Sequence, residues 1–219
     1  MVTFEDIRKN EEINIYIQKA DEALSALGFT EHSFAHVTLC AQNASNILAQ
    51  LGYPERECEL AKIAGYMHDI GNVVNRIDHA QSGAVMAFRI LDHLNMPPQE
   101  IAMVISAIGN HDEHTAAPIN PVAAALILAD KSDVRRTRVR NSDFATFDIH
   151  DRVNYAVEKA RCTLDTEQHT FTLDIKIDTQ ICPVMDYFEI FINRMILCRR
   201  AADYLKLQFK LNINESSIL

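Results

Sequence analysis

Apolar residues recur at helical spacing through the first half of the chain, and this pattern predicts a series of amphipathic helices. Residues 4–27 carry one continuous apolar stripe, with Thr3 suited to begin a helix and Gly28 suited to end it. A second helix is predicted from the capping residue Thr30 to Gly52. Each of these two long helices has one apolar face to bury.

The stretch ELAKIAGYMHDIG, residues 59–71, is apolar on more than one face, which predicts a helix inside the core. Pro54 stands where a proline can open this helix, and Gly71 is a suitable stop. The helix carries His68 and Asp69 at its end. These two polar side chains are costly to bury unless another group pairs with them or a metal binds them.

Three more helices are predicted, at residues 79–95, at 99–109 and from 121 to about 130. The first begins at His79, and the second ends just before His111. The third starts at Pro121, continues through eight apolar residues and reaches Asp130. It is therefore a second buried helix that carries an acid near its end.

The pattern changes after Asp130. Five basic residues lie between Lys131 and Arg140. From Thr170 onward, apolar and polar residues alternate, which indicates a half-buried strand. The predicted elements are a helix at 150–160, strands at 161–164 and 171–177, a helix at 183–205 and a strand at 207–213. We predict that the strands form a short antiparallel sheet packed on the last helix.

These elements predict a mainly α-helical protein in two parts. Residues 1–145 would form a multi-helix domain, and residues 146–219 a small C-terminal α/β appendage. A length of 219 residues suits one domain with an appendage. The composition, 48% hydrophobic and 23% charged, is typical of a soluble globular protein.

The net charge of −9 argues against a general nucleic-acid binder and against attachment to a membrane through a basic surface. A small anionic substrate remains compatible with it, because local cations or a metal can reverse the field. The first residues are acidic and polar, unlike a signal peptide, and no apolar run is long enough to span a membrane. The five cysteines have no CxxC spacing, which indicates reduced thiols. We therefore expect a cytoplasmic protein.

Histidine and aspartate residues at helix positions and helix ends are the candidate site. The candidates are His36, His68, Asp69 and Asp130, with His79, His111 and His114 beside them. Imidazole and carboxylate ligands suit divalent iron, manganese, zinc, cobalt or nickel. A single buried histidine is more often a hydrogen-bonded core residue. Several buried polar groups at once all need partners, which favours metal binding.

Ordered motifs carry a family resemblance over residues 30–135. FAHV at His36, GYMHDIG at His68 and Asp69, and LILADKSD at Asp130 resemble the HD superfamily of metal-dependent phosphohydrolases. The segments DHAQSGAVMA at His79 and IGNHDEH at His111 resemble the additional histidines of two-metal members. Those members include enzymes that hydrolyse dinucleoside polyphosphates or cyclic dinucleotides.

The resemblance implies a helical metal-binding domain and a role for each matching residue. The first metal would be bound by His36, His68, Asp69 and Asp130. Asp69 would bridge to a second metal on His79 and His111, with His114 as a further helper. Asp69 would also orient or deprotonate the attacking water. Lys131 and Arg135, with Arg136 or Arg138 as alternatives, would neutralise the substrate phosphate.

The sequence departs from the family pattern at Asn72, where many relatives have a lysine after HDIG. This residue leaves the metal ligands untouched but changes the expected contact with phosphate. We expect hydrolysis of a phosphate ester or anhydride, in a nucleotide-like substrate, with one or two divalent metals. The alternatives are a regulatory module that binds a phosphate ligand around a structural metal, and redox chemistry at a di-iron site. An exposed sheet edge makes a homodimer possible.

Overall fold

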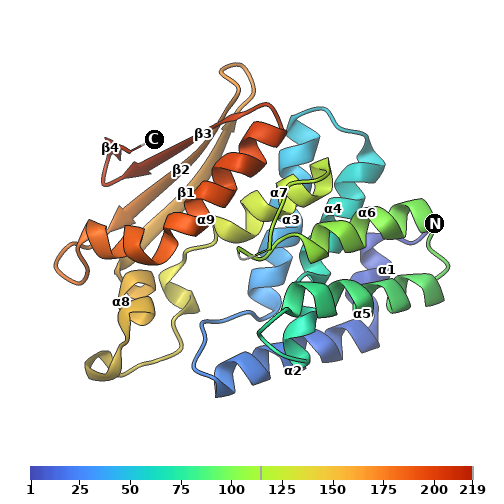
Figure 1. Ribbon diagram of the computed structural model, residues 1–219, viewed down its shortest axis with the longest axis horizontal. Helices are drawn as coiled ribbons and strands as arrows, with labels where there is room; N and C mark the ends of the chain where they lie inside the picture. Colours follow the sequence, from blue (N-terminus) through green and yellow to red (C-terminus); the bar gives the residue numbers. More distant parts are fainter. Residues whose placement is uncertain (114, 219) are drawn as a thin grey trace.

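The computed structural model describes residues 1–113 and 115–218. A bundle of helices lies beside a four-stranded sheet, which confirms the mainly helical class with a small C-terminal sheet (Figure 1). The bundle contains α1 (Phe4–Lys9), α2 (Glu11–Ala26), α3 (Phe34–Gln50), α4 (Glu55–Met67), the 3-10 helix η1 (Ile70–Val73), α5 (His79–His93), α6 (Pro98–Gly109) and α7 (Pro121–Lys131). The predicted boundary near residue 145 stays a prediction.

The C-terminal part begins with two short 3-10 turns, η2 (Arg136–Arg138) and η3 (Phe144–Thr146). Its longer elements are α8 (Ile149–Ala156), β1 (Val157–Asp165), β2 (Thr170–Ile177), α9 (Val184–Tyr204), β3 (Gln208–Ile213) and β4 (Ser216–Ser217). Within the described residues, no helix combines the length and the hydropathy that crossing a membrane requires.

The single helix predicted over residues 4–27 is two helices, because the chain breaks at Asn10. Its backbone is extended, and its side chain accepts a hydrogen bond from Ile13 N at 3.1 Å, which caps α2. The next helix begins at Phe34 rather than near Thr30. The residues between Thr30 and Phe34 are not helical, and Glu31 N donates to Arg138 O at 2.8 Å in a long-range contact.

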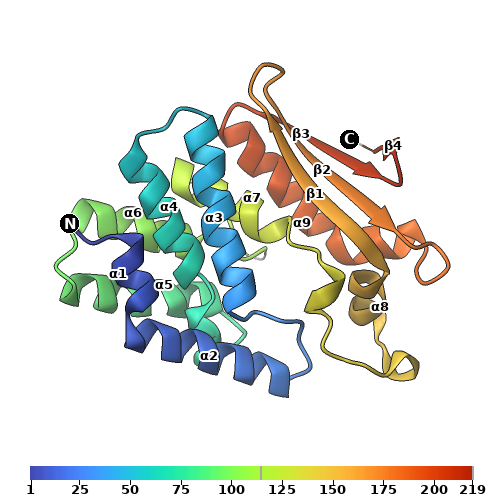
Figure 2. The ribbon, with the colours of Figure 1, turned by 180° about the vertical axis from the view of Figure 1, so that it is seen from behind.

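The core helix α4 lies side by side with α3, as both views of the ribbon show (Figure 2). It ends at Met67, so the prediction that it stops at Gly71 was wrong. Gly71 has another role, because a Cβ on it would stand 2.0 Å from His79 O. The absence of a side chain at Gly71 thus lets η1 pack directly on the start of α5.

The sheet has the order β1-β2-β3-β4 and is mixed, whereas we predicted an antiparallel one. β1 and β2 are antiparallel, as are β3 and β4, but β2 and β3 are parallel. Helix α9 connects β2 to β3, so the chain enters β3 in the direction in which it entered β2. β1 starts at Val157, where we predicted helix, because α8 ends at Ala156.

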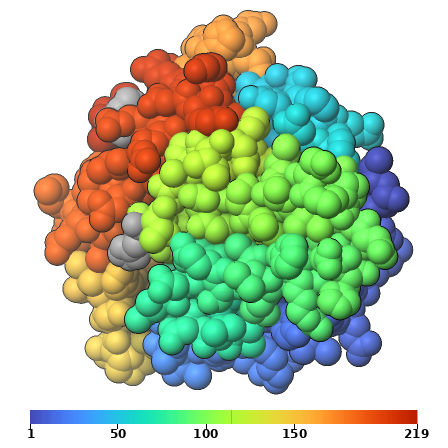
Figure 3. Space-filling model, turned by 45° about the vertical axis from the view of Figure 1, so that its right-hand side comes forward, coloured from blue at the N-terminus to red at the C-terminus, as the bar shows by residue number. Residues whose placement is uncertain are grey.

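Helix α9 lies between the sheet and the helical bundle (Figure 1). Phe171 and Leu173 of β2 are buried on the inner face of the sheet, and Phe191 and Met195 of α9 are buried as well. On the other side α9 packs against α7, the helix that carries Asp130. Figure 3 shows the surface built by α5 and α6, with α9 along its edge. The C-terminal part therefore touches the helix that brings an acid to the candidate site.

Candidate metal centre

Six elements bring the six predicted ligand residues to one buried place. His36 is on α3, His68 directly follows α4, Asp69 precedes η1, His79 is the first residue of α5, His111 follows α6, and Asp130 is near the end of α7. All six side chains are buried. His114, the further predicted helper, lies outside the described residues. The ligand roles themselves stay a prediction, while the structure shows that the residues meet.

The two carboxylate oxygens of Asp69 face two different pairs of histidines. Oδ2 is 3.1 Å from His68 Nε2 and 3.6 Å from His36 Nε2. Oδ1 is 3.6 Å from His79 Nε2 and 3.9 Å from His111 Nε2. Asp69 is therefore placed between two groups of nitrogen donors, as a bridging carboxylate would be.

Asp130 belongs to the first of these groups. Its Oδ1 is 3.3 Å from His36 Nε2 and 3.8 Å from His68 Nε2. His36, His68 and Asp130 hold their ligand atoms close enough together for one metal ion. Asp69 Oδ2 points to the same atoms, so this group has two nitrogens and two carboxylate oxygens available.

Hydrogen bonds at Nδ1 fix the tautomer of three of the histidines. His68 Nδ1 donates to Gly65 O at 2.8 Å, His79 Nδ1 to Arg76 O at 3.0 Å, and His111 Nδ1 to Ile108 O at 2.6 Å. A carbonyl oxygen only accepts, so Nδ1 carries the proton and Nε2 presents its lone pair to the centre.

Some of these inward atoms lack a hydrogen-bond partner. Among the described residues, His68 Nε2 and Asp69 Oδ2 are buried without one, although they are close to each other. His79 Nε2 and His111 Nε2 lie only 3.2 Å apart, and both are acceptors in the tautomers given above. Buried acceptors that face one another in this way fit a cation between them.

The charge states of the site also suit a cation. Burial alone would raise the pKa of Asp69, but neighbouring His68 holds it well below its ordinary value. Burial likewise opposes ionisation of Asp130, and Lys131 beside it holds the pKa of that carboxyl low. Burial lowers the pKa of His79 and of His111. The centre therefore holds ionised carboxylates beside the neutral imidazoles of His79 and His111 at neutral pH, whereas at His68 the charge of Asp69 outweighs burial and raises the pKa. Carboxylates and neutral imidazoles are the forms that bind divalent metals.

Cys40 is a neighbour of the centre that the sequence analysis did not single out. Its Sγ is 3.6 Å from Nε2 and 3.7 Å from Nδ1 of His36, one helical turn earlier on α3. The nearly equal distances place the sulfur beside the ring rather than in line with the lone pair of Nε2. Burial raises the pKa of the Cys40 thiol well above its ordinary value. The signal available in the sequence was its position four residues after His36, because residues four apart on a helix lie on the same face.

The two predicted phosphate-neutralising residues are both engaged with carboxylates. Lys131 Nζ is buried, 2.7 Å from Asp130 Oδ2 and 3.3 Å from Glu113 Oε2. Arg135 donates from Nε to Asp133 Oδ1 at 2.6 Å and from Nη2 to Asp133 Oδ2 at 3.0 Å. Their part in catalysis stays a prediction, and their contacts are those of residues that support Asp130 and Asp133.

Asn72, at the position of the missing lysine, is bound to the bridging acid. Its Nδ2 donates to Asp69 Oδ1 at 2.9 Å and to Asp69 O at 3.0 Å. A cation is nonetheless nearby, since Arg76 Nη1 lies 3.3 Å from Asn72 Oδ1 and 3.4 Å from His79 Nε2. The sequence analysis missed Arg76, because it lies four residues beyond the motif.

A cavity of about 510 Å³ adjoins the centre. Its walls come from the loop before α3, from residues next to the ligands and from α8 and α9; they include Phe29, His32, Arg76, Glu113, Arg138, Asp148, His150, Asp151, Asn154, Phe191, Asn193 and Arg194. It reaches the ligands through His32, whose ring centroid is 5.5 Å from that of His36, and through Arg76. The C-terminal part therefore forms one side of this cavity.

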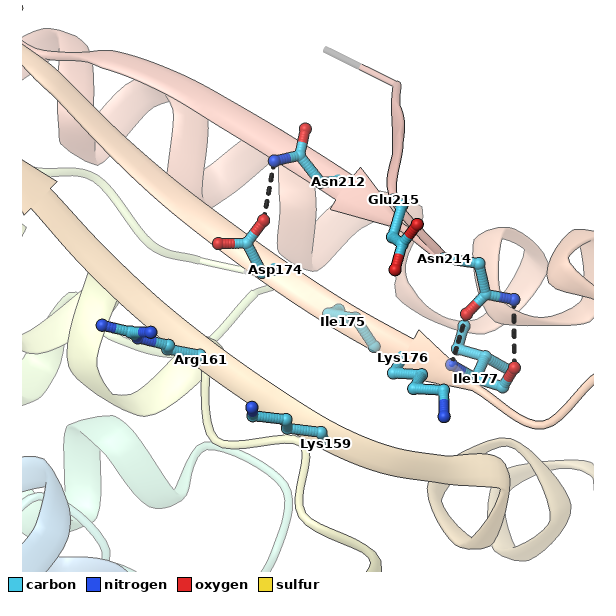
Figure 4. Close-up of a pocket in the computed structure, with 9 residues that line it drawn as sticks. All are labelled: Lys159, Arg161, Asp174, Ile175, Lys176, Ile177, Asn212, Asn214 and Glu215. Atoms are coloured by element: carbon cyan, nitrogen blue, oxygen red, sulfur yellow. Dashed lines mark hydrogen bonds between the residues drawn. The ribbon is translucent and has the colours of Figure 1, made fainter.

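A second hollow, of about 450 Å³, lies on the outer face of the sheet (Figure 4). Both charges line it, with Lys159, Arg161 and Lys176 beside Asp174 and Glu215. None of the six candidate ligands is among its lining residues. The candidate ligands therefore adjoin the first cavity and not this hollow.

Comparison with known proteins agrees with this geometry. Residues 31–135 match the model of the HD domain family, whose members are in general metal-dependent hydrolases. The chain is 24% identical over 159 residues to the uncharacterized protein MJ1020 of Methanocaldococcus jannaschii, a match that covers 63% of this chain. The chain spans 61% of the length of that relative. The family match and the buried histidine and aspartate cluster together identify residues 31–135 as an HD domain.

Proposed function

We propose that this protein is a metal-dependent phosphohydrolase that acts on a phosphate ester or anhydride. One observation carries the proposal above the others. The two oxygens of Asp69 face two separate histidine pairs, His36 with His68 and His79 with His111. A carboxylate with that placement suits two cations that share it.

The ligand assignment follows from the two groups of atoms. His36, His68, Asp69 and Asp130 would hold one divalent ion, and Asp69 would share a second ion with His79 and His111. Such ions, when bound, polarise a phosphate and lower the pKa of a bound water. The donors are imidazole and carboxylate, so iron, manganese, zinc, cobalt and nickel all fit.

The chain's own residues prepare the site for that chemistry. The backbone carbonyls of Gly65, Arg76 and Ile108 hold three imidazoles with Nε2 directed inward. Burial excludes bulk water from the ligand atoms, which strengthens each charge interaction there. Asp69, ionised and central, is the group that we propose orients the attacking water and accepts its proton.

The adjoining cavity supports a small substrate. A volume of about 510 Å³ lies in the range of pockets that hold ligands of nucleotide size. Three arginines are among its lining residues, which favours an anionic ligand. We therefore propose a nucleotide-like phosphate compound as the substrate class.

The first test is metal content. Protein purified without chelator should contain about two metal ions per chain by elemental analysis, and Asp69→Ala should lose them. The matched control is Asp203→Asn, an exposed acid on α9, which should keep the metal of the wild type. One ion per chain would remove His79 and His111 from the ligand set. No metal, even after addition of manganese or iron, would overturn the proposal.

The second test is turnover. Hydrolysis of p-nitrophenyl phosphate or bis-p-nitrophenyl phosphate should require metal and stop on addition of chelator. A metal-loaded protein that binds phosphate but hydrolyses neither compound nor any nucleotide would instead be the regulatory module. Substrate-dependent oxygen uptake by an iron-loaded protein would point to the redox alternative.

A further inference from the structure

Two arginines that are not among the candidate ligands line the cavity beside the metal centre. Arg76 lies between η1 and α5, and Arg194 lies on α9. Each guanidinium is placed against an aromatic ring. Arg76 Cζ is 5.6 Å from the ring centroid of Phe29, and Arg194 Cζ is 4.6 Å from that of Phe191. Stacking orients a planar guanidinium without using its N–H donors.

Each arginine also has one polar anchor. Arg194 Nε donates to Glu113 Oε1 at 3.0 Å, and Arg76 Nη1 reaches Asn72 Oδ1 at 3.3 Å. Arg76 Nη1 also lies close to His79 Nε2. Within the described residues, the two guanidiniums make no hydrogen bonds other than these three. Among the described residues, both Nη groups of Arg194, and Nε and Nη2 of Arg76, have no hydrogen-bond partner and are available to a ligand in the cavity.

Each arginine is connected by polar contacts to one of the candidate ligands. Arg76 Nη1 lies 3.4 Å from His79 Nε2. On the other side, Glu113 links Arg194 to Lys131, with Glu113 Oε2 3.3 Å from Lys131 Nζ, and Lys131 contacts Asp130 at 2.7 Å. The two arginines are thus tied to opposite ends of the ligand set, one to His79 and the other to Asp130.

The remainder of the cavity has the opposite character. Asp148 and Asp151, at the start of α8, line it together with Asn154 and Asn193. Carboxylates and amides accept hydrogen bonds from hydroxyl and amino groups, and carboxylates repel a second phosphate. The cavity therefore offers cations near the metal centre and acceptors farther along its wall.

We propose that Arg76 and Arg194 jointly bind one terminal phosphate of the substrate, whose organic part carries hydroxyl or amino donors. This inference rests on the proposed phosphohydrolase function and adds the substrate class to it. A terminal phosphate has three non-bridging oxygens and close to two charges, which suits two forked donors, whereas an internal diester has two such oxygens and one charge. Arg76 supplies the cation that Asn72 does not, and α9 completes a site that the HD domain begins.

Calorimetric titration with inorganic phosphate tests this directly on the full-length, metal-containing protein. Arg194→Gln should weaken phosphate binding about ten- to hundredfold, the effect expected for loss of a charge-assisted hydrogen-bond donor. Arg76→Gln should weaken it to a similar degree. The matched control is Arg199→Gln, an exposed arginine five residues farther along α9, which should bind phosphate as the wild type does.

A second pair of measurements keeps the test decisive. Arg194→Lys retains the charge beside Glu113 and so the fold, yet it loses the fork and should still bind phosphate more weakly than the wild type. Dimethyl phosphate, a diester probe, should bind more weakly than inorganic phosphate and should be insensitive to Arg194→Gln. Unchanged phosphate affinity in both Arg194 variants, or an equal loss in Arg199→Gln, would overturn the inference.

The binding experiment separates this inference from the proposed function. If phosphate binds through Arg194 but no phosphate compound is hydrolysed, the inference stands and the proposed function fails. If p-nitrophenyl phosphate is hydrolysed with the same KM by wild type and Arg194→Gln, the function stands and the inference fails.

Discussion

Asp133 Oδ2 accepts a hydrogen bond from His36 Nδ1 at 2.7 Å, across 97 positions of the sequence. The same carboxylate also accepts hydrogen bonds from Nε and Nη2 of Arg135. Burial would raise the pKa of Asp133, but the bonds from His36 and Arg135 hold it well below its ordinary value. An ionised acid at this place fixes the ring of His36 and makes its Nε2 a stronger donor to a metal.

Replacement of Asp133 by asparagine should therefore weaken metal binding without removing a ligand. We expect a loss of about ten- to a hundredfold in affinity for manganese or zinc, as for other partners of ligating histidines. Metal titration of wild type and Asp133→Asn measures it, with Asp203→Asn as the exposed control. Equal affinities in all three proteins would show that Asp133 does not orient His36.

Gly71 should tolerate no side chain. Since a Cβ there would stand 2.0 Å from His79 O, Gly71→Ala must push η1 and α5 apart. We expect a loss of at least about 2 kcal/mol in the free energy of unfolding, together with lower metal content. In the control Gly109→Ala, the new Cβ would meet its nearest atom at 3.6 Å, so little change is expected. Urea unfolding curves of equal midpoint for the two variants would contradict this.

Acid should destabilise the protein partly through Glu113. Burial opposes its ionisation, but Lys131 and Arg194 hold its pKa far below the ordinary value. A lowered pKa in the folded state adds stability that is present above the unfolded value, about pH 4.3, and is lost progressively as the pH falls from there toward the lower pKa of the folded state. Unfolding by urea at pH 7, 5, 4 and 3 should show a smaller loss below pH 5 for Glu113→Gln than for wild type. Parallel losses would exclude this contribution.

Cys40 should be dispensable for metal binding despite its closeness to His36. Its sulfur lies beside the imidazole ring, and its raised pKa keeps the thiol protonated at neutral pH. Cys40→Ala should therefore retain the metal content of the wild type, whereas His36→Ala should lose metal. Elemental analysis of the two variants decides it, and a metal-free Cys40→Ala protein would make the thiol a ligand.

The sequence predicted which residues meet at the candidate site, whereas several element boundaries around it were wrong. His36, His68 and Asp130 could be found because each is a polar residue on a buried helix, and such residues require a partner. The geometry of Asp69 could only be expected through the family resemblance. Asp133 lies three residues after Asp130, and the structure places it against His36.

The errors arose where distant contacts override local pattern. The start of α3 moved from Thr30 to Phe34 because the backbone of Glu31 pairs with Arg138, far along the chain. The parallel pairing of β2 and β3 could not be inferred from alternation, which gives the face of a strand but not its direction. Arg194 belongs to an otherwise ordinary amphipathic helix, so only its place in the cavity marks it.

The crossover through α9 has a further consequence. The strands β2 and β3 pair side by side only because α9 joins them, and the same helix presents Arg194 to the cavity. All six candidate ligands lie between His36 and Asp130, outside this unit. Changes in the last third of the sequence can therefore alter the shape and charge of the cavity while every candidate ligand stays in place, so that in this architecture the candidate metal centre and the cavity wall are free to evolve separately.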